Sequence, residues 1–295
     1  MNYQTGIIAA IPPVARYLTF QAKRQADVRP ALHQLLAIAD GETLVVGFGK
    51  ALLLQLGIQQ PNLPNFPSYT HAGINIPSTP ADIWCWLRGS ERGELFLQSQ
   101  EVIECLASAF DCVSVVDGFC HQQGRDLTGY EDGTENPVDD AALNAAFVQG
   151  QGENMDGGSF VAVQQWLHDM PIFKGMSSTQ QDHTFGRRRT DNEELDDAPE
   201  SAHVKRTAQE SFSPEAFVLR RSMAWSAEAQ GGLVFVSFGH SLQAFNAQLR
   251  RMVGLEDGIT DALFTFTHPL TGAYFWCPPV KNGRVQLAVS KILFG

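Results

Sequence analysis

Short apolar stretches separated by turn residues run through the first half of the chain and predict alternating strands and helices. Continuous apolar runs of about four to eight residues are typical of buried strands, whereas apolar residues three and four positions apart indicate one face of a helix. On this basis we predict strands at Ala15–Phe20, Leu44–Phe48, Ile83–Leu87 and Asp111–Phe119, and helices at Pro30–Ala39 and Gln98–Ala109. Between the second and third strands, Gln59–Pro80 is rich in Pro, Asn and Ser and is predicted to be a long loop.

The second half repeats this theme more loosely, although no sequence repeat connects the two halves. The predicted strands are Ser159–Gln164, Phe217–Arg220, Leu233–Phe238, Phe264–Phe266 and Gly272–Trp276, and the predicted helix is Leu242–Val253. This helix has apolar residues on one face and is stopped by Gly254, a residue type that favours helix ends. The polar run Gly175–Glu210 is too long and too charged for a simple connection, so it is either a solvated loop or a functional one.

The order of elements in the first half is strand, helix, strand, strand, helix, strand, which is the order of a ferredoxin-like unit. Two such units predict two antiparallel sheets faced by helices, an α+β architecture. The length of 295 residues also favours two domains of ordinary size over one large domain. We place the boundary near Pro137–Asp139, which gives domains 1–137 and 138–295, with Gly150–Gly158 as the alternative boundary.

Composition narrows the classes of partner. The net charge of −11 would repel a phosphate backbone, so we predict no nucleic-acid partner. The longest apolar stretches, around Ala51–Leu56 and Leu233–Phe238, are too short to cross a bilayer, and Met1–Ala10 lacks the pattern of a signal peptide. Five cysteines without a CxxC pair suit reduced thiols. We therefore predict a cytoplasmic protein without a membrane partner.

The segment Gly129–Pro137 has two interpretations. Its two glycines let the backbone turn sharply around Asp132, so the segment can present this carboxylate as an active-site loop. It can equally be an ordinary turn that leads into a helix at Ala141–Phe147, capped by Asp139 or Asp140. A calcium loop is less suitable, because the alternating oxygen ligands and the distal glutamate are missing. From the residues alone, the first two interpretations both stay open.

Several segments together resemble one family. Gly129, Asp132 and Gly133, followed by Thr134-x-Asn136-Pro137, resemble the signature of the dye-decolourising peroxidases, which use haem. Further similar segments follow in the order typical of that family: Ile76–Leu87 precedes the signature, and Phe185–Asp191, Ala202–Thr207, Val218–Ser222, Asp261–Thr267 and Gly272–Pro279 come after it. The resemblance therefore covers nearly the whole chain. It implies that the two units build a barrel-like dimeric α+β fold with haem b in the C-terminal half.

The resemblance also selects one histidine out of eight, which the chemistry of imidazole by itself does not do. The Ala202–Thr207 match implies that His203 is the proximal ligand, and hence the metal ligand, of the haem iron. Asp261 is the candidate for the anionic partner of its other ring nitrogen. Without the resemblance to the family, a helix cap or a turn residue is an equally good interpretation of Asp261.

Asp132 and Arg220 are then expected on the opposite, distal side of the haem. A carboxylate can shuttle the proton between the two peroxide oxygens, and a permanently charged guanidinium can stabilise charge while the O–O bond breaks. We expect Arg220 to be indispensable and Asp132 to dominate at acid pH. Ser222 occupies a position where many members carry Asn, so the resemblance does not carry over the hydrogen bond of that Asn to a distal water. The alternative is that the serine hydroxyl replaces the Asn through a further water.

The resemblance implies further haem contacts for four residues within these segments. The residues are Gly133, Thr134, Glu135 and Arg187, besides Arg220 itself. For Arg187, a guanidinium suits a haem propionate because it can bind a carboxylate through two hydrogen bonds. The alternative is that Arg187–Arg189 is simply a solvated basic patch.

These assignments predict a haem peroxidase that reduces hydrogen peroxide and oxidises small one-electron donors such as dyes or phenols. The family also implies a homo-oligomer, a dimer or larger. The alternative function is a haem-handling protein, which would be a carrier, a sensor or a deferrochelatase-like, iron-releasing factor on the same fold. A haem carrier would bind the same ring with the same residues but would show little oxidation of donors.

Overall fold

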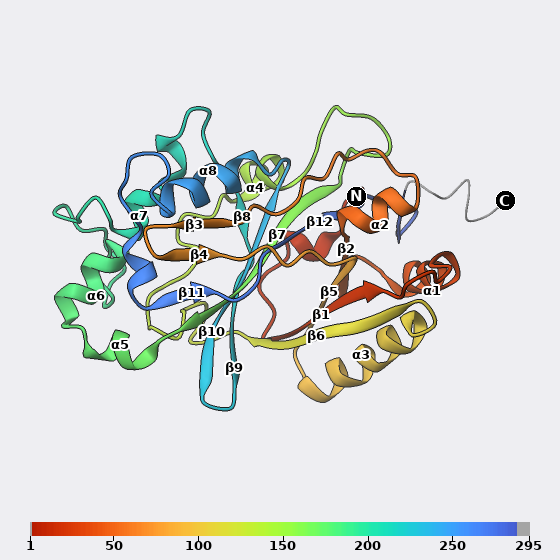
Figure 1. The fold of residues 1–295 in the computed structure, drawn as a ribbon, viewed down its shortest axis with the longest axis horizontal. Helices are drawn as coiled ribbons and strands as arrows, with labels where there is room; N and C mark the ends of the chain where they lie inside the picture. Colours follow the sequence, from red (N-terminus) through yellow and green to blue (C-terminus); the bar gives the residue numbers. More distant parts are fainter. Residues whose placement is uncertain (1, 288–295) are drawn as a thin grey trace.

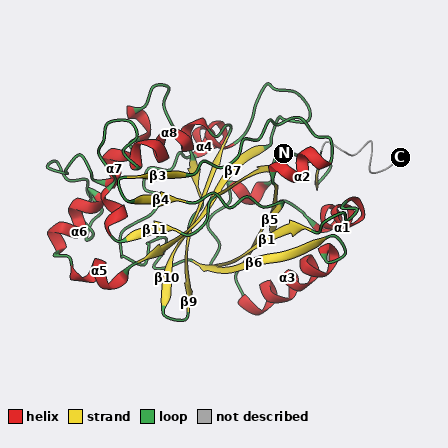
Figure 2. Ribbon diagram, in the orientation of Figure 1, coloured by secondary structure: helices red, strands yellow, loops and turns green. Residues whose placement is uncertain are grey.

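The strands of the computed structural model, which describes residues 2–287, form one large antiparallel sheet (Figures 1 and 2). Their order in the sheet is β11-β7-β12-β2-β5-β1-β6-β9-β10-β8, and β7 also pairs with β10. The bounds are β1 Val14–Ala22, β2 Leu44–Phe48, β5 Ile83–Gly89, β6 Phe110–Phe119, β7 Ser159–His168, β8 Leu219–Arg220, β9 Met223–Ala227, β10 Gln230–Gly239, β11 Thr267–Pro269 and β12 Ala273–Cys277. The pairing of β7 with both β10 and β12 closes the sheet into a barrel-like ring.

The two halves of the chain use the same strand pairing. In the first half, β1 pairs with β5 and β6, and β5 pairs with β2. In the second half, β7 pairs with β10 and β12, and β10 pairs with β9. The α+β class is confirmed, but the two expected sheets are joined into one, because β12 pairs with β2 and β6 pairs with β9. The division into ferredoxin-like domains 1–137 and 138–295 stays a prediction, which the repeated pairing supports.

Helices cover the outer side of the sheet in both halves (Figure 2). In the first half they are α1 Arg29–Ile38, α2 Lys50–Gln55 and α3 Arg92–Leu106; later come α5 Met170–Gly175, α6 Ser178–Phe185, α7 His203–Arg206 and α8 Gln243–Met252. A further helix, α4 Asp139–Ala146, packs through Ala142 and Ala146 against the apolar cluster inside the ring. One apolar cluster lies between helices and sheet, and a second, which includes Trp84, Trp86, Phe238 and Phe275, fills the inside of the ring. The pocket described below lies outside the ring, on the side of the later helices.

The structure corrects several local predictions. α3 begins at Arg92, earlier than expected, because the Glu91 side chain caps it by accepting hydrogen bonds from Gly93 and Glu94. The predicted strand Phe264–Phe266 is wrong, since Ala262–Thr265 is a short 3-10 helix and the strand begins only at Thr267. Two regions predicted as loops contain regular structure, namely the hairpin β3 Tyr69–His71 with β4 Ile74–Ile76, and helices α6 and α7.

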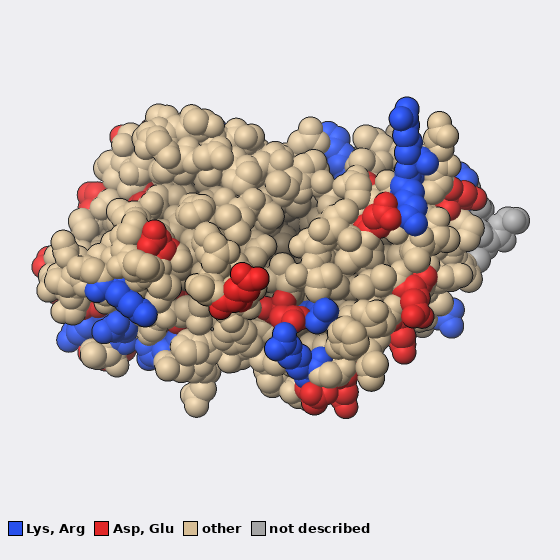
Figure 3. All heavy atoms as spheres, turned by 60° about the horizontal axis from the view of Figure 1, so that its bottom comes forward, with Lys and Arg blue, Asp and Glu red and all other residues tan. Residues whose placement is uncertain are grey.

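Charged side chains are dispersed over the face shown in Figure 3. Lys and Arg lie there in separate small groups among Asp and Glu, with wide uncharged areas between them. This mixture gives no continuous basic band on that face. None of the helices among residues 2–287 combines the length and the apolar character that crossing a membrane requires.

Candidate functional site

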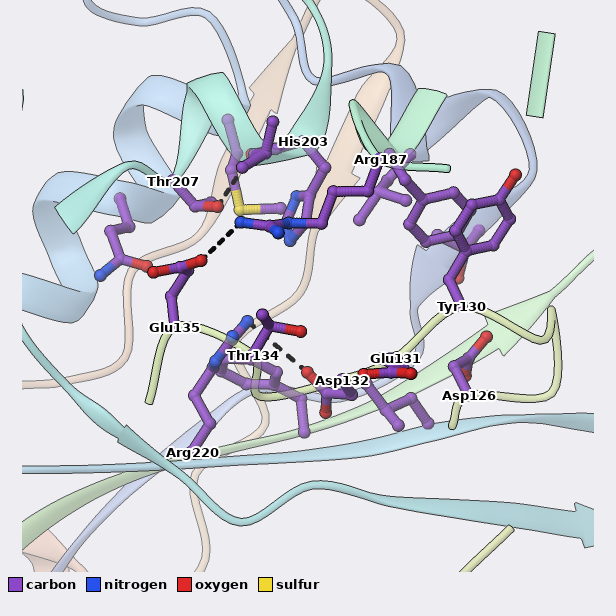
Figure 4. Close-up of a pocket in the computed structure, with 18 of the residues that line it drawn as sticks. Asp126, Tyr130, Glu131, Asp132, Thr134, Glu135, Arg187, His203, Thr207 and Arg220 are labelled. Atoms are coloured by element: carbon purple, nitrogen blue, oxygen red, sulfur yellow. Dashed lines mark hydrogen bonds and ion pairs between the residues drawn. The ribbon is translucent and has the colours of Figure 1, made fainter. Parts of the chain in front are cut away.

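A pocket between the sheet and the later helices collects most of the residues that the sequence selected (Figure 4). Its lining includes Asp132, Thr134, Glu135, Arg187, His203 and Arg220. Asp261 supports His203 from behind, and Gly133 shapes the loop that presents Asp132. The pocket therefore draws on both predicted domains, because the loop that carries Asp132 belongs to the first and the rest of these side chains to the second.

His203 is the first residue of α7 and is held by a buried carboxylate. Its Nδ1 lies 2.7 Å from Oδ2 of Asp261, which is 1% exposed. The other carboxylate oxygen of Asp261 accepts a hydrogen bond of 2.9 Å from the backbone N–H of Leu263. Asp261 is thus both the partner of His203 and a helix cap. Because an ionised carboxylate only accepts hydrogen bonds, Nδ1 donates, and the lone pair of the neutral ring is on Nε2, where a metal can bind.

The loop Gly129–Pro137 is tightly folded and presents Asp132 to the pocket. The backbone of Gly133 has φ +80°, and a side chain at this position would place its Cβ 2.7 Å from Nδ2 of Asn136. Asp132 itself is tied to the preceding segment by a hydrogen bond of 3.1 Å from its N–H to the carbonyl of Gly124. The capping interpretation is not seen, since α4 begins at Asp139 without a side-chain cap.

Asp132 and Arg220 face each other across one side of the pocket. Nη1 of Arg220 lies 3.6 Å from Oδ1 of Asp132, and the two side chains are 17% and 22% exposed. Figure 4 shows this pair on the opposite side of the pocket from His203. The arrangement therefore provides an imidazole on one side and a carboxylate with a guanidinium on the other, with space between them.

Arg187 lines the pocket and pairs with two acidic side chains that are more exposed than its own. It forms an ion pair with Glu135 and a longer one, 3.2 Å, with Glu194, and its side chain is 16% exposed. Arg188, by contrast, is 47% exposed and pairs with Glu193 on the surface. Both interpretations of the basic run Arg187–Arg189 are therefore partly right. Arg187 faces the pocket, whereas Arg188 belongs to a solvated basic patch.

Asn136 connects the loop of Asp132 to the strand of Arg220. Its Nδ2 donates to the backbone carbonyl of Arg220 at 3.0 Å, and its Oδ1 accepts from the backbone N–H of Arg220 at 2.8 Å. An amide is suited to this task because it carries a donor and an acceptor side by side. Asn136 is part of the sequence signature, but its link to Arg220 could not be read from spacing.

We expect Asn136→Ala to lower both stability and the rate of reaction with peroxide. Loss of the two hydrogen bonds should lower the free energy of unfolding by about 1–3 kcal/mol, because it leaves backbone groups of Arg220 without partners. The rate should fall because the backbone that carries Arg220 is no longer fixed. Thermal unfolding and rapid-mixing absorbance measure the two effects. Asn136→Asp, which keeps the acceptor and loses the donor, should lie between the wild type and Asn136→Ala in both measurements.

The pocket wall contains a second buried His–Asp pair, which the sequence did not predict. Nε2 of His168 lies 3.0 Å from Oδ1 of Asp126, and its Nδ1 lies 2.7 Å from the hydroxyl of Thr267. Burial raises the pKa of the Asp126 carboxyl, but the hydrogen bonds and the charge of His168, with further hydrogen bonds from Thr128, more than offset this and leave the pKa below its usual range. The predicted strand ended at Gln164, four residues too early, so the alternation along β7 that leads to His168 was missed.

A family model and the related sequences all match peroxidases of the dye-decolorizing type. The sequence model of the family described as "Dyp-type peroxidase, C-terminal" matches residues 123–282. A dye-decolorizing peroxidase of Mycobacterium tuberculosis is 27% identical over 295 residues, covering 93% of this chain and 88% of that protein. Another, from Rhodococcus erythropolis, is 31% identical over 248 residues, covering 81% of this chain and 73% of that protein.

Solved structures agree with these sequence matches. A dye-decolorizing protein from V. cholerae is 29% identical and superimposes with a TM-score of 0.84 over 94% of this chain and 97% of that chain. A variant of DypB from Rhodococcus jostii RHA1 in complex with heme is 27% identical, with a TM-score of 0.84 over 92% of this chain and 94% of that chain. Sequence and fold thus match over almost the same length.

Proposed function

The chain belongs to the Dyp-type peroxidase family and is a haem peroxidase, and we propose that His203 binds the iron while Asp132 and Arg220 act on peroxide from the other side. The observation that carries these residue roles is the arrangement of the pocket. It has an imidazole oriented by Asp261 on one side and an acid–guanidinium pair 3.6 Å apart on the other. This extends the prediction of a haem peroxidase, which the comparisons confirm, to individual residues.

The residues of the pocket fit a haem. The neutral ring of His203 offers Nε2 to a metal, and its link to a buried carboxylate is the usual support for a metal-binding histidine. Apolar side chains suited to a flat porphyrin also line the pocket, among them Phe245, Leu249, Met252, Leu263 and Phe266. When bound, haem would supply the redox chemistry, namely the two electrons that reduce peroxide and that donors then return one at a time.

Asp132 and Arg220 supply the acid–base and electrostatic part of the reaction. The carboxylate of Asp132 takes the proton from the inner oxygen of hydrogen peroxide and delivers it to the outer oxygen, which leaves as water. The guanidinium of Arg220 stays charged throughout and stabilises the negative charge that develops while the O–O bond breaks. Their separation of 3.6 Å lets one peroxide molecule contact both groups.

Gly133, Thr134, Glu135 and Arg187 complete the proposed haem site. Arg187 is the cation available to a propionate at the pocket edge, where Glu135 and Glu194 orient it in the structure. Thr134 accepts a hydrogen bond of 2.9 Å from Asn192, which fixes the other side of the same rim. Gly133 allows the tight turn beside Asp132, since its φ of +80° disfavours a side chain at this position.

The wild-type protein loaded with haem tests the proposal directly. We expect the absorption spectrum to change within milliseconds to seconds of adding one equivalent of hydrogen peroxide, and to return when a phenol or an anthraquinone dye is added. A protein that binds haem but shows neither change would contradict the proposed function. The same protein would fit a haem carrier if it passed its haem to an acceptor such as apomyoglobin without oxidising donors.

Two further parts of the proposal concern the whole protein. Hydrogen peroxide and small electron donors are its partners as a peroxidase, and we propose that it acts as a homo-oligomer, a dimer or larger, in the cytoplasm. Light scattering coupled to size-exclusion chromatography measures the oligomeric state. Cell fractionation measures the location.

A further inference from the structure

His168 is a buried histidine of the pocket wall whose two ring nitrogens bind two different parts of the chain. Its Nε2 lies 3.0 Å from Oδ1 of Asp126, and its Nδ1 lies 2.7 Å from the hydroxyl of Thr267. His168 and Asp126 are each 9% exposed, and Thr267 is 4% exposed. All three residues line the pocket, so one ring connects pieces of the pocket wall that are 42 and 99 residues away from it in the sequence.

The hydrogen bonds around this ring determine which atoms donate. Oδ2 of Asp126 accepts from the N–H and the hydroxyl of Thr128 at 2.9 and 2.5 Å, and the pKa of this carboxyl lies below its usual range, so it is ionised. Because an ionised carboxylate only accepts, Nε2 of His168 donates. The hydroxyl of Thr267 donates to the carbonyl of Leu167 at 3.0 Å, so it accepts from Nδ1. Both ring nitrogens therefore carry a proton, and His168 is an imidazolium.

The bond to Asp126 reaches the distal side of the pocket through a short hairpin. The N–H of Asp126 donates to the carbonyl of Tyr130 at 2.8 Å. The N–H of Asp132 donates to the carbonyl of Gly124 at 3.1 Å. Asp126 and Asp132 thus lie on the two paired arms of the hairpin, and Figure 4 shows both on the same side of the pocket. A displacement of Asp126 would therefore also displace the carboxylate that acts on peroxide.

The bond to Thr267 reaches the proximal side through a single helical turn. The 3-10 helix Ala262–Thr265, which Asp261 caps, leads through Phe266 directly into Thr267. The carbonyl of Phe266 also accepts a bond of 2.6 Å from the N–H of Asp169, which directly follows β7. The end of β7 therefore holds the segment whose carboxylate supports the proposed iron ligand.

We propose that His168 is a positioning residue of the haem pocket, which fastens the distal side through Asp126 and the proximal side through Thr267 to the same strand. The inference rests on the proposed function and adds a residue that acts through others and not on iron or peroxide itself. A neutral ring donates one hydrogen bond, whereas the imidazolium donates two, so the charged ring can hold both sides together. Fixed spacing matters because small displacements of catalytic groups can cost large factors in rate.

The protonation of the ring is measured in the haem-free protein and does not depend on peroxidase activity. In protein that carries isotope-labelled histidine, we expect nitrogen NMR at neutral pH to show both ring nitrogens of His168 protonated. The signal is assigned by its absence from the His168→Asn variant. A ring with only one protonated nitrogen would overturn the inference, because it could not donate to Asp126 and to Thr267 at once.

Two amide variants separate the two bonds. In His168→Asn the amide N–H takes the place of Nδ1 and keeps the bond to Thr267, whereas in His168→Gln it takes the place of Nε2 and keeps the bond to Asp126. We expect His168→Asn to lower the bimolecular rate with hydrogen peroxide about tenfold, with haem affinity close to that of the wild type. His168→Gln should weaken haem binding about threefold to tenfold and keep most of the peroxide rate. Rapid mixing measures the rate, and titration at the Soret band measures the affinity.

Thr267→Val and Thr267→Ser form a second pair, which leaves His168 and Asp126 in place. Valine has the shape of threonine without the hydroxyl, so Thr267→Val should weaken haem binding about as much as His168→Gln does. Thr267→Ser keeps the hydroxyl and should bind haem like the wild type. Equal haem affinity in the two variants would contradict the part of the inference that concerns the proximal side.

A comparison of double variants distinguishes positioning from a general loss of stability. If His168 acts through Asp132, His168→Asn should slow the peroxide reaction about tenfold in the wild type but less than about twofold in the Asp132→Asn background. Equal factors in both backgrounds, or a wild-type rate in His168→Asn, would overturn the inference. Failure of the wild type to react with peroxide would instead contradict the proposed function, and the NMR measurement would still test His168.

Discussion

Replacing His203 with alanine is expected to weaken haem binding more than about 100-fold and to reduce peroxidase activity to background. Second-layer partners of metal ligands are each worth about 10- to 100-fold in affinity, so loss of the ligand itself should cost more. The geometry is specific to this histidine, because its Nδ1 is held 2.7 Å from Asp261 and its Nε2 is left for a metal. Titration of the haem-free variant with haem, followed at the Soret band, measures the affinity.

Asp261 provides the matched control for this experiment. Asp261→Asn keeps an oxygen that can accept the hydrogen bond from Leu263 N–H, so the cap of the following 3-10 helix is retained. It removes the negative charge from the partner of His203, and we expect haem affinity or activity to fall by about 10- to 100-fold. Normal haem binding by His203→Ala would show that another histidine binds the iron. Recovery of His203→Ala by added imidazole would support the assignment.

The regular elements were predictable wherever the apolar period was clear. Leu44–Phe48 was predicted with the bounds that the structure has, and Pro30–Ala39 differs from α1 by one residue at each end. Closure of the sheet was not predictable, because it depends on pairs such as Trp276 with Phe48, which are far apart in the sequence. Local patterns report which face of a strand is apolar, but they do not say which strand will be its neighbour.

The site also contains residues that the sequence predicted and residues that it did not. The family signature led to Asp132, His203 and Arg220, and the structure brings all three to one pocket. It did not lead to His168, because the place of this residue in the pocket wall comes from the face of β7 on which it lies. In addition, interpretations that competed at the level of sequence coexist in the fold. Asp261 both caps a helix and binds His203, since its two oxygens serve different donors.

Replacing Arg220 with alanine is expected to slow the reaction with hydrogen peroxide by about 10²- to 10³-fold, because removal of one charge-stabilising donor from an active site has effects of that size. Haem affinity should change much less, since His203 and Arg187 remain. Rapid-mixing absorbance over a range of peroxide concentrations gives the bimolecular rate. Arg188→Ala is the matched control, because Arg188 is 47% exposed and pairs with Glu193 outside the pocket, so its rate should equal that of the wild type.

The comparison with Asp132 decides how the two distal groups share the work. If Arg220 is indispensable, Asp132→Asn should keep a larger fraction of the peroxide rate than Arg220→Ala at neutral pH, because the guanidinium still stabilises the departing oxygen. At acid pH, where little peroxide loses its proton unaided, the loss in Asp132→Asn should grow because its amide is a poor base. Equal losses in both variants at every pH would contradict this division and would point to the ion pair, 3.6 Å long, as the functional unit.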